Sequence, residues 1–432
     1  MRRAALLFAL MAPLLAAQAV PENSQAGRTE LGWLRVPSVR FDPFRHAFVP
    51  HWGFVFTAGG FGENNTLNAS DLGAFLVLQD NDDLRVGDAI DAMGLLPRGA
   101  DAAGTGAGDA TFYLGGPIGA LAIGVTAGGR GYGAFRLDDQ AVALLRDGNG
   151  GLQEFSLGNS GGAALGTAEA GLHLLYRTRP IGSPDGVRLT FGAGARIVRP
   201  VFYASARSTV ANGGRVLVSN DTILANLGIQ IQVTPIDNSS EVTDAAFSGT
   251  RGSGLAADLV LRADWPTNGI AFEAMLANLG SVTVERVERT AYNINVASTR
   301  LDVVLDSIEV QTADSNRVRD TVSVDVTLPR VARIGGSAWA NRILQLDATL
   351  SLAVTGDFAT PAAVELGSTW RFVRTLPLRA GLIIGGTQGI GYTAGFGIEG
   401  RNLLFRVNGQ SLGGFLKNAR GAGAQVVVGT FF

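Results

Sequence analysis

Cysteine is absent from the 432-residue chain, which therefore has no disulfide, no thiolate metal site and no cysteine nucleophile. Lysine is nearly absent as well, since Lys417 is the only one among 35 basic residues. The formal net charge of −2 becomes −4 when Arg2 and Arg3 are removed, so the chain lacks the basic excess of a nucleic-acid-binding protein. After residue 19, no apolar run approaches the roughly 18 residues of a membrane helix. If such a chain crosses a membrane, it does so as strands.

The first 19 residues have the order of a secretory signal peptide. Arg2 and Arg3 precede an apolar run from Ala4 to Ala17, and Ala17-Gln18-Ala19 supplies the small-x-small cleavage pattern. We predict a mature chain that starts near Val20, and the lack of a cysteine after the cleavage site argues against a lipoprotein. The alternative, a buried N-terminal helix, accounts less well for the charged–apolar–small order.

Glycine is abundant instead, and its 59 residues are about twice the usual share for this length. Glycine weakens an isolated strand, but it is common where strands bend or crowd in a barrel wall. About fourteen segments have the length and alternation of barrel strands. They lie at 48–60, 109–115, 118–137, 167–178, 186–199, 254–265, 269–282, 328–340, 344–355, 362–373, 376–386, 390–400, 402–410 and 421–432.

The lengths of the connections distinguish a membrane barrel from a soluble sandwich, because both show alternating strands. From 344 to 354, for example, Leu and Ala side chains occupy one face and Gln, Asp, Thr and Ser the other. Counted back from the last strand, every second connection is short. The other set contains all the long segments, which are 61–108, 137–166, 201–252 and 283–327. Short turns on one side and long loops on the other are typical of an outer-membrane barrel, with the long loops outside the cell.

The long segments differ in character. Residues 70–96 and 138–147 have helical spacing, whereas 201–253 are rich in Asn, Ser, Thr and Gly. Residues 281–327 alternate well, so we expect that their hairpin could extend beyond the membrane. Residues 20–47 precede the first strand and could plug the lumen. Aromatic residues at strand ends suit the girdles of a membrane barrel, namely Tyr176, Trp265, Trp339 and Trp370.

The last strand, 421–432, ends the chain on an aromatic residue. Read with a period of two, Phe432 and Val428 lie on one face, and Phe431 and Val427 lie on the other. This segment resembles the closing strand of a bacterial outer-membrane barrel. In such barrels the final Phe is read by the barrel-assembly machinery, and the resemblance implies that Phe432 is the assembly signal.

Three stretches carry a further likeness. Leu255–Gly280 is a strand–turn–strand that ends in Asn-Leu-Gly, Leu328–Trp339 begins with LP-x-x-x-R-x-G, and Glu365–Gly400 contains two closing hairpins. These stretches resemble the FadL-like superfamily of outer-membrane proteins. Three upstream stretches are similar to an uncharacterised branch near the TraF-like and PorV-like barrels: Leu145–Gly150, Ala168–Arg177 and Gly186–Pro200.

The resemblance covers roughly 111–432 and implies a barrel of about fourteen strands. In the FadL-like transporters, an N-terminal hatch and a lateral opening let hydrophobic molecules through the wall. PorV-like relatives are instead partners in protein secretion and surface attachment. No motif in this chain identifies either activity, so no binding residue is carried over.

If the apolar faces contact lipid, a set of ionisable residues faces the lumen. An interior network of ion pairs explains this set better than acid–base catalysis or a cation site does. The mixture of charges also argues against a pore that is selective for one ion. The residues are Glu169, His173, Arg188, Arg196, Asp258, Arg262, Asp264, Asp347, Glu365, Arg371, Arg379 and Arg406.

Motifs of catalysis and cofactor binding are absent. His46, His51 and His173 are scattered and lack the paired spacing of a zinc site. Gly395–Gly400 matches G-x-G-x-x-G, but it lies on a predicted strand that another strand follows, with no helix to hold a phosphate. We therefore predict no enzyme, no cofactor and no metal site.

Together these features predict an all-β protein, a transmembrane antiparallel β-barrel of about 14 strands over 48–432, after a signal peptide at 1–19 and a possible hatch at 20–47. We predict the outer membrane of a Gram-negative-type bacterium, and a passive channel or uptake route for small hydrophobic solutes. The alternatives are a surface scaffold or partner in protein secretion, and a structural barrel with a blocked lumen. The predicted partners are outer-membrane lipid, the barrel-assembly machinery, and hydrophobic small molecules or secreted proteins, with no nucleic acid.

Overall fold

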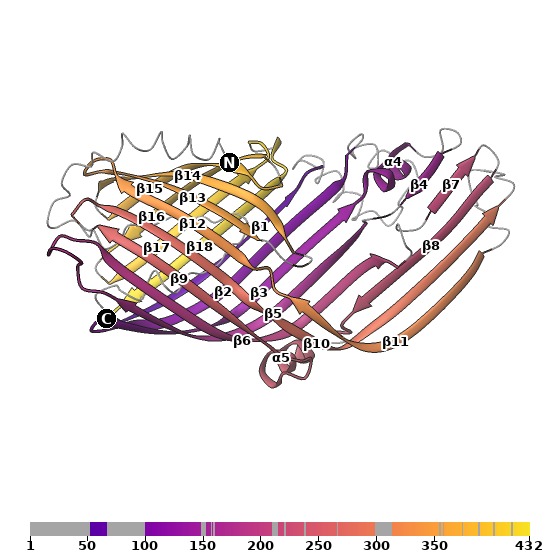
Figure 1. The fold of residues 1–432 in the computed structure, drawn as a ribbon, viewed down its shortest axis with the longest axis horizontal. Helices are drawn as coiled ribbons and strands as arrows, with labels where there is room; N and C mark the ends of the chain where they lie inside the picture. Colours follow the sequence, from indigo (N-terminus) through magenta and orange to yellow (C-terminus); the bar gives the residue numbers. More distant parts are fainter. Residues whose placement is uncertain are drawn as a thin grey trace.

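The computed structural model is a closed β-barrel whose sheet continues beyond one end (Figure 1). The structure describes residues 52–66, 100–147, 153–156, 158, 160–209, 215–219, 222–236, 239–265, 267–298, 313–353, 356, 358–373, 375–387, 389–400, 402–415 and 418–432. The predicted signal peptide, the segment 20–47 and the helical spacing at 70–96 lie outside these ranges.

Fourteen strands form the ring, each antiparallel to the next, and the last pairs with the first between Gly53↔Phe431 and Glu63↔Gly421. This closure confirms the predicted 14-stranded barrel. In order the ring strands are β1 (Gly53–Asn64), β2 (Ala102–Ile118), β3 (Leu121–Leu137), β5 (Gly161–Arg177), β6 (Arg188–Ser208), β9 (Gly254–Trp265), β10 (Ile270–Ser298), β12 (Val331–Trp339), β13 (Leu344–Ala353), β14 (Thr360–Val373), β15 (Leu376–Gly385), β16 (Gly389–Glu399), β17 (Leu403–Leu412) and β18 (Gly421–Phe431).

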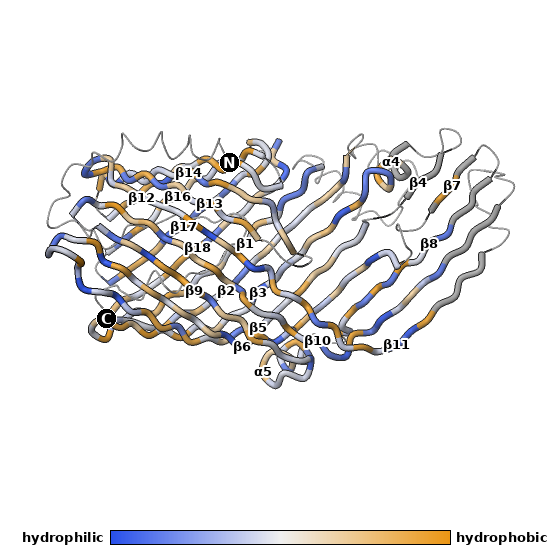
Figure 2. The backbone as a smooth tube through the Cα atoms, viewed as in Figure 1, coloured by the Kyte–Doolittle hydropathy of each residue, from blue (hydrophilic) through white to orange (hydrophobic). Residues whose placement is uncertain are grey.

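Hydropathy alternates along the ring strands (Figure 2), and the burial of the side chains places polar residues inside the ring and apolar residues outside it. On β13, Gln345, Asp347 and Thr349 are buried, whereas Leu350 is 40% exposed on the other face. Large apolar side chains are exposed on the outer faces of the other strands as well, for example Leu172, Leu259 and Phe396. A water-soluble barrel would bury these groups, so the distribution is that of a membrane-spanning barrel.

The aromatic girdle is only partly as predicted. Tyr176 is 49% exposed on the outer face, and Trp265 packs edge-on against the outward-facing Phe272. Trp339 is different, because it lies on the buried face of β12 with Arg333 and Ser337 and is only 9% exposed. Its assignment to the girdle was wrong, since the alternation of β12 turns its last residue toward the lumen.

Several strands are longer than the sequence pattern predicts, mainly at the end with the long connections. β2 begins at Ala102 instead of 109, β5 begins at Gly161 instead of 167, and β6 continues to Ser208 instead of 199. β10 continues to Ser298, which confirms that its hairpin extends beyond the barrel. Each strand continues because its neighbour continues beside it and satisfies its backbone hydrogen bonds.

Four more strands build an extension of the sheet beyond the barrel. They are β4 (Gln153–Ser156), β7 (Arg215–Ser219), β8 (Thr222–Val233) and β11 (Ala313–Thr327). They extend the wall in the order β11–β10–β8–β7–β4, seen on the right of Figure 1. The segment 201–253, expected to be a polar loop, therefore contains two strands and a helix.

Two helices accompany the extension. α4 (Asp139–Asp147) confirms the helical spacing predicted at 138–147, and α5 (Ser239–Ser248) was not predicted. Among the described residues, no helix is both long enough and apolar enough to cross a bilayer.

Strands β8 and β9 lie one above the other in the same gap between β6 and β10. β9 pairs with β6 at Arg188–Val198 and with β10 at Ile270–Val282. Beyond that level β8 pairs with both neighbours, up to Ser208 of β6 and Ser298 of β10. The chain leaves the wall between them, at 234–253, and α5 lies in this excursion. The excursion therefore marks where the barrel ends and the extension begins.

Candidate functional site

A cavity of about 690 Å³ opens at the mouth of the barrel, the end with the long connections. Small residues of β2, β3 and β5 line much of it, among them Ala103, Ala134 and Ala163. Arg136, which lies opposite Ala103 in the register of β2 and β3, also lines it and is ion-paired with Asp101. The cavity thus combines small apolar groups with a charged pair, and its size suits a small solute more than a large one.

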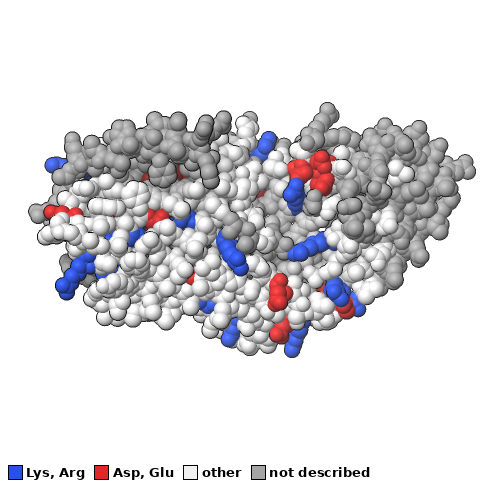
Figure 3. Space-filling model, in the orientation of Figure 1, with Lys and Arg blue, Asp and Glu red and all other residues white. Residues whose placement is uncertain are grey.

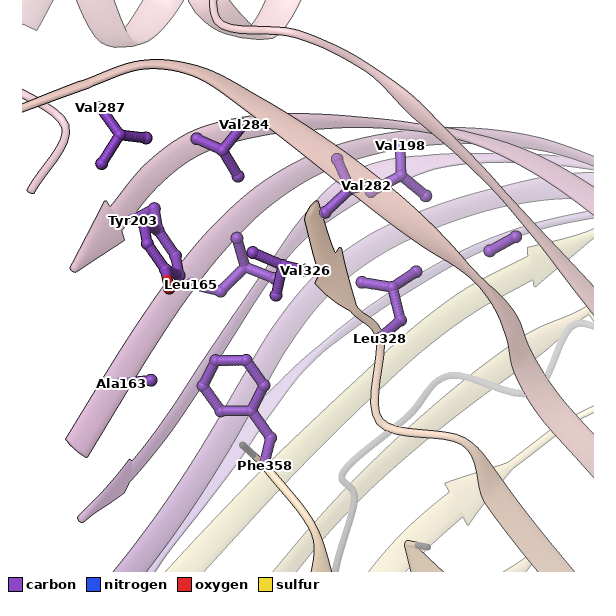
Figure 4. Close-up of a cluster of buried hydrophobic side chains, with 11 residues drawn as sticks. Ala163, Leu165, Val198, Tyr203, Val282, Val284, Val287, Val326, Leu328 and Phe358 are labelled. Carbon is purple, nitrogen blue, oxygen red and sulfur yellow. The ribbon is translucent and has the colours of Figure 1, made fainter. Parts of the chain in front are cut away.

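A buried apolar cluster adjoins this cavity (Figure 4). Ala163 belongs to both, and Phe358 of the cluster directly precedes Ala359, which lines the cavity. The Phe358 ring comes from the β13–β14 connection and lies 5.8 Å from the ring of Tyr132 on β3. The other members come from β5, β6, β9, β10, β11 and the β11–β12 link: Leu165, Val198, Tyr203, Ala256, Val282, Val284, Val287, Val326 and Leu328.

A layer of ion pairs lies next to the cluster inside the lumen, on the side of the short-turn end. The Arg196 guanidinium donates to Asp258 at 3.0 Å, and it also forms an ion pair with Glu169. Arg130 contacts the same Glu169 carboxylate at 3.1 Å. Asp258 is fully buried and Arg196 is 2% exposed. Two guanidinium groups here face two carboxylates, so the charges of the layer are compensated within it.

Asn278 joins this ion-paired layer to the barrel wall. Its side-chain oxygen accepts a hydrogen bond of 2.7 Å from Arg196, and its backbone N–H donates to Asp258 at 2.9 Å. Its φ of 59° is left-handed, and it sits in a bulge of β10 between Leu276 and Leu279. The side-chain amide also donates to Pro329 O at 2.9 Å, across the wall.

The contact between Asn278 and Pro329 crosses a seam in the wall. Up to Ala277, β10 pairs with β12, and from Ser281 onward it pairs with β11. Between these ladders the residues 278–280 face 328–330, where Pro329 has no N–H to donate. The Leu328 N–H donates to Gly280 O over a long distance of 3.4 Å. The wall is therefore more weakly bonded here than along its regular ladders.

The opposite side of the lumen has its own ion-paired group. Arg379 donates to Asp347 at 2.6 Å and to Glu365 at 2.7 Å, and all three side chains are at most 5% exposed. Arg333 and Glu273 form another buried pair, between β12 and β10.

Closer to the short-turn end, Glu399 receives hydrogen bonds from Arg371 and Arg406, each at 2.6 Å. Arg262 and Asp264 pair at 2.7 Å, and half-buried Arg188 lies opposite Asp264 in the register of β6 and β9.

His173 is also interior, at 1% exposure, and its Nε2 lies 2.9 Å from Thr126 Oγ1. The structure thus brings the predicted lumen-facing residues onto inward faces, divided among several separate groups. His46 and His51 lie outside the described residues.

Sequence reasoning missed several members of these groups. Arg130, Glu273, Arg333 and Glu399 lie in predicted strands, and the alternation rule would have found them had it been applied to every strand. Asn278 had no such signal, because a bulge shifts the alternation of its strand at that point.

Phe432 lies at the short-turn end and is 69% exposed on the outer face, while Phe431 is buried inside. The backbone N–H of Phe432 donates to Trp52 O at 2.8 Å, beside the start of β1. The role of Phe432 in assembly stays a prediction.

Neither a family model nor a curated protein matches the chain. Solved structures of membrane barrels are similar. The toluene transporter TodX of Pseudomonas putida has 10% identity and a TM-score of 0.44, over 88% of this chain and 90% of that chain. The toluene transporter TbuX of Ralstonia pickettii has 10% identity and a TM-score of 0.43, over 88% of each chain.

A FadL homologue of Pseudomonas aeruginosa has 12% identity and a TM-score of 0.39, over 96% of this chain and 99% of that chain. It bears the name of the superfamily that the sequence resembles. With identities and TM-scores this low, we transfer no residue's role from these structures, and the barrel rests on the strand pairing of this chain.

Proposed function

We propose that the barrel lies in the outer membrane and takes up small hydrophobic solutes. The observation that carries this proposal is the continuity between the mouth cavity and the buried apolar cluster, which share Ala163 and meet at Phe358 and Ala359. A solute that displaces the Phe358 ring leaves water for an apolar surrounding, which is favourable by about 25 cal/mol per Å² of apolar surface.

The ion-paired layer then decides the direction of exit. An apolar solute that moved on along the axis would separate Arg196 from Asp258 and Glu169, and buried charges that lose their partners are costly. The seam offers another route, because Val282, Val326 and Leu328 of the cluster flank it. We therefore propose that the solute leaves sideways between β10 and the β11–β12 link, into the lipid.

Influx of N-phenylnaphthylamine, a small apolar dye, into intact cells tests the route. The chain has no cysteine, so a Ser281→Cys/Thr327→Cys pair can tie β10 to β11 beside the seam without mispairing. We expect this crosslink to slow influx and reductant to restore it. Gln345→Cys/Thr369→Cys, across β13 and β14, is the matched control that should leave influx unchanged.

The opposite change is Asn278→Gly. Glycine accepts the left-handed backbone conformation but removes the bonds to Arg196 and Pro329, so we expect faster influx through a barrel that still assembles. Equal influx with and without the unmodified protein would reject uptake altogether. Influx that depends on the protein but not on either seam variant would reject only the sideways exit.

A second candidate function is a surface partner for secreted proteins. The specific observation in its favour is the ordered extension, in which β7, β8 and β11 add paired strands beyond the mouth. We expect a deletion that joins Ser208 to Gly254 to leave a folded barrel. If that deletion releases a protein from the cell surface and leaves dye influx intact, the extension serves a partner instead of the solute.

A further inference from the structure

Helix α5 lies on the outside of the barrel wall, between the end of β8 and the start of β9 (Figure 1). From Gly254, β9 needs 12 residues to reach the short-turn end at Trp265. A membrane-spanning strand needs about 9–11 residues, so α5 lies about one membrane thickness from that end.

The outer surface changes its chemistry at the level of α5. On the barrel side, the nearest outward residues of β6 and β9 are Ile197, 52% exposed, and Leu255, 69% exposed. On the extension side, an exposed ion pair joins Glu288 of β10 to Arg319 of β11. In Figure 3 a blue patch lies at the lower left end, most of the lower surface beside it is uncharged, and red and blue side chains gather from the middle of the lower edge onward. The change from apolar to charged surface marks the boundary of the bilayer.

The helix is fixed in place by contacts to the wall. Arg199 of β6 donates to the carbonyl oxygens of Ala246, at 3.3 Å, and Phe247, and so satisfies the C-terminal end of α5. Gly249, at φ 68°, returns its N–H to Ala245 O at 3.2 Å, and Ala245 itself is fully buried against the wall. A helix held in this way presents its remaining face in one orientation.

Arg251 ties the excursion to the wall from the other side. Its guanidinium, 8% exposed, pairs with Glu241 at 2.9 Å and donates to Pro235 O at 2.6 Å. These residues line a cavity of about 340 Å³ together with Asp244 and Arg286. The cavity therefore offers both carboxylate and guanidinium groups beside the rim.

The face turned away from the wall carries an apolar side chain that no wall contact explains. Phe247 is 80% exposed, the highest value among the large apolar residues described, and Ile236 in the same excursion is 40% exposed. In water this exposure is unfavourable, but at a bilayer boundary an aromatic ring contacts lipid chains.

We propose that α5 is a lipid-surface anchor, with Phe247 inserted at the outer edge of the bilayer and the Arg251 cavity facing the lipid headgroups. Lipid is the occupant because the exposed apolar surface of Ile197 and Leu255 continues directly toward α5. The anchor fixes the depth of the barrel in the membrane and keeps the mouth cavity above it. This inference rests on the membrane-spanning barrel and not on the proposed solute.

A single labelled cysteine at residue 247 tests the anchor, because the unmodified chain has no other thiol. The full chain with Phe247→Cys, carrying a nitrobenzoxadiazole label, is reconstituted in lipid vesicles that contain shallow or deep spin-labelled lipids. Leu259→Cys, in the outer apolar belt of β9, is the deep control. Asn293→Cys, exposed on β10 beyond the rim, is the aqueous control.

We expect shallow spin labels to quench residue 247 at least about three times more than residue 293, because interfacial helices enter the headgroup boundary by about 5–10 Å. Deep labels should quench residue 259 most. Quenching at residue 247 equal to that at residue 293 would overturn the anchor. A label at 247 that is shielded from both lipid and aqueous iodide would also overturn it, in favour of a second copy or a partner protein on this face.

Discussion

The two halves of the barrel wall are built alike within the membrane and differ beyond it. Strands β12 to β18 have 9 to 14 residues, near the about 9–11 that a spanning strand needs. Strands β2, β3 and β5 have 17 residues each, β6 has 21 and β10 has 29. We refer to these halves as the short wall and the tall wall. Closure of the ring needs only the spanning residues, so the additional length of the tall wall has another use.

The contents of the two halves differ accordingly. The short wall encloses ion pairs such as Arg379 with Asp347. The tall wall has the same kind of layer around Arg196, and beyond it lie the apolar cluster, the mouth cavity and α5. Ion pairs therefore stabilise the interior that both walls share, whereas the proposed solute site and membrane anchor belong to the additional residues of the tall wall.

The largest expected effect comes from the short wall. Arg379→Ala leaves Asp347 and Glu365 buried without their shared guanidinium, and we expect a loss of about 3–5 kcal/mol in unfolding free energy. Urea unfolding in lipid vesicles, followed by tryptophan fluorescence, measures it. Arg406→Ala is the matched variant, and its loss should be less than half as large because Glu399 keeps Arg371. Equal losses would show that pairing within these groups does not set stability.

The next effect concerns the contact between the walls. Phe358 comes from the short wall and is buried in the cluster of the tall wall, at 3% exposure. Phe358→Ala should lower the unfolding free energy by about 3 kcal/mol, because it leaves a cavity among aliphatic side chains. The same urea titration checks this value. An unchanged midpoint would mean that the two halves are coupled only through their backbone ladders.

A smaller effect is expected where the excursion returns to the tall wall. Gly252 has φ 104°, and a Cβ there would collide with Thr283 O, so Gly252→Ala should cost about 1–3 kcal/mol. Gly131, on β3, has open space around its Cβ position, and Gly131→Ala should change stability by less than about 0.5 kcal/mol. Unfolding of both variants side by side makes the comparison, and a similar cost for each would refute the steric explanation.

The smallest effect is a pH dependence confined to the extension. The side-chain hydrogen bond from Arg289 holds the pKa of Asp320 below its usual range. A carboxyl group whose pKa is depressed in the folded state stabilises that state at pH values above its unfolded-state pKa. This stabilisation is lost as the pH falls through the folded-state pKa. Cleavage of the extension by pepsin should therefore become slightly faster toward acid in the unmodified chain. Asp320→Asn should weaken this dependence, and an unaltered pH profile would exclude the pair as its cause.

The sequence predicted the ring well, for a physical reason. Within the membrane every strand has one lipid face and one lumen face, so alternation is strict and reads directly from residues such as Asp347 and Leu350. The same rule located Arg379 and Glu365 on inward faces, although it could not show that they contact each other. Partners on neighbouring strands depend on register, which alternation alone leaves open.

The extension was harder to predict because both of its faces lie outside the lipid. Beyond the rim, neither face must be apolar, and the short apolar sequence of β8 was hidden within the Asn-, Ser-, Thr- and Gly-rich segment 201–253. The bulge at Asn278 was also hidden, since an asparagine in a strand gives no sign of its φ. Helix α5 has a short and weakly amphipathic sequence, and its position depends on Arg199, which lies far from it in the chain.

The stacking of β8 on β9 has a consequence for how this architecture can change. Within the ring, β9 alone pairs with both β6 and β10. Beyond the ring, β8 pairs with the same two strands and keeps the register between them. Strand pairs can therefore be added to or removed from the extension without altering the strand number or stagger of the ring. The barrel can therefore keep its diameter while the sheet extension above it is lengthened, shortened or replaced.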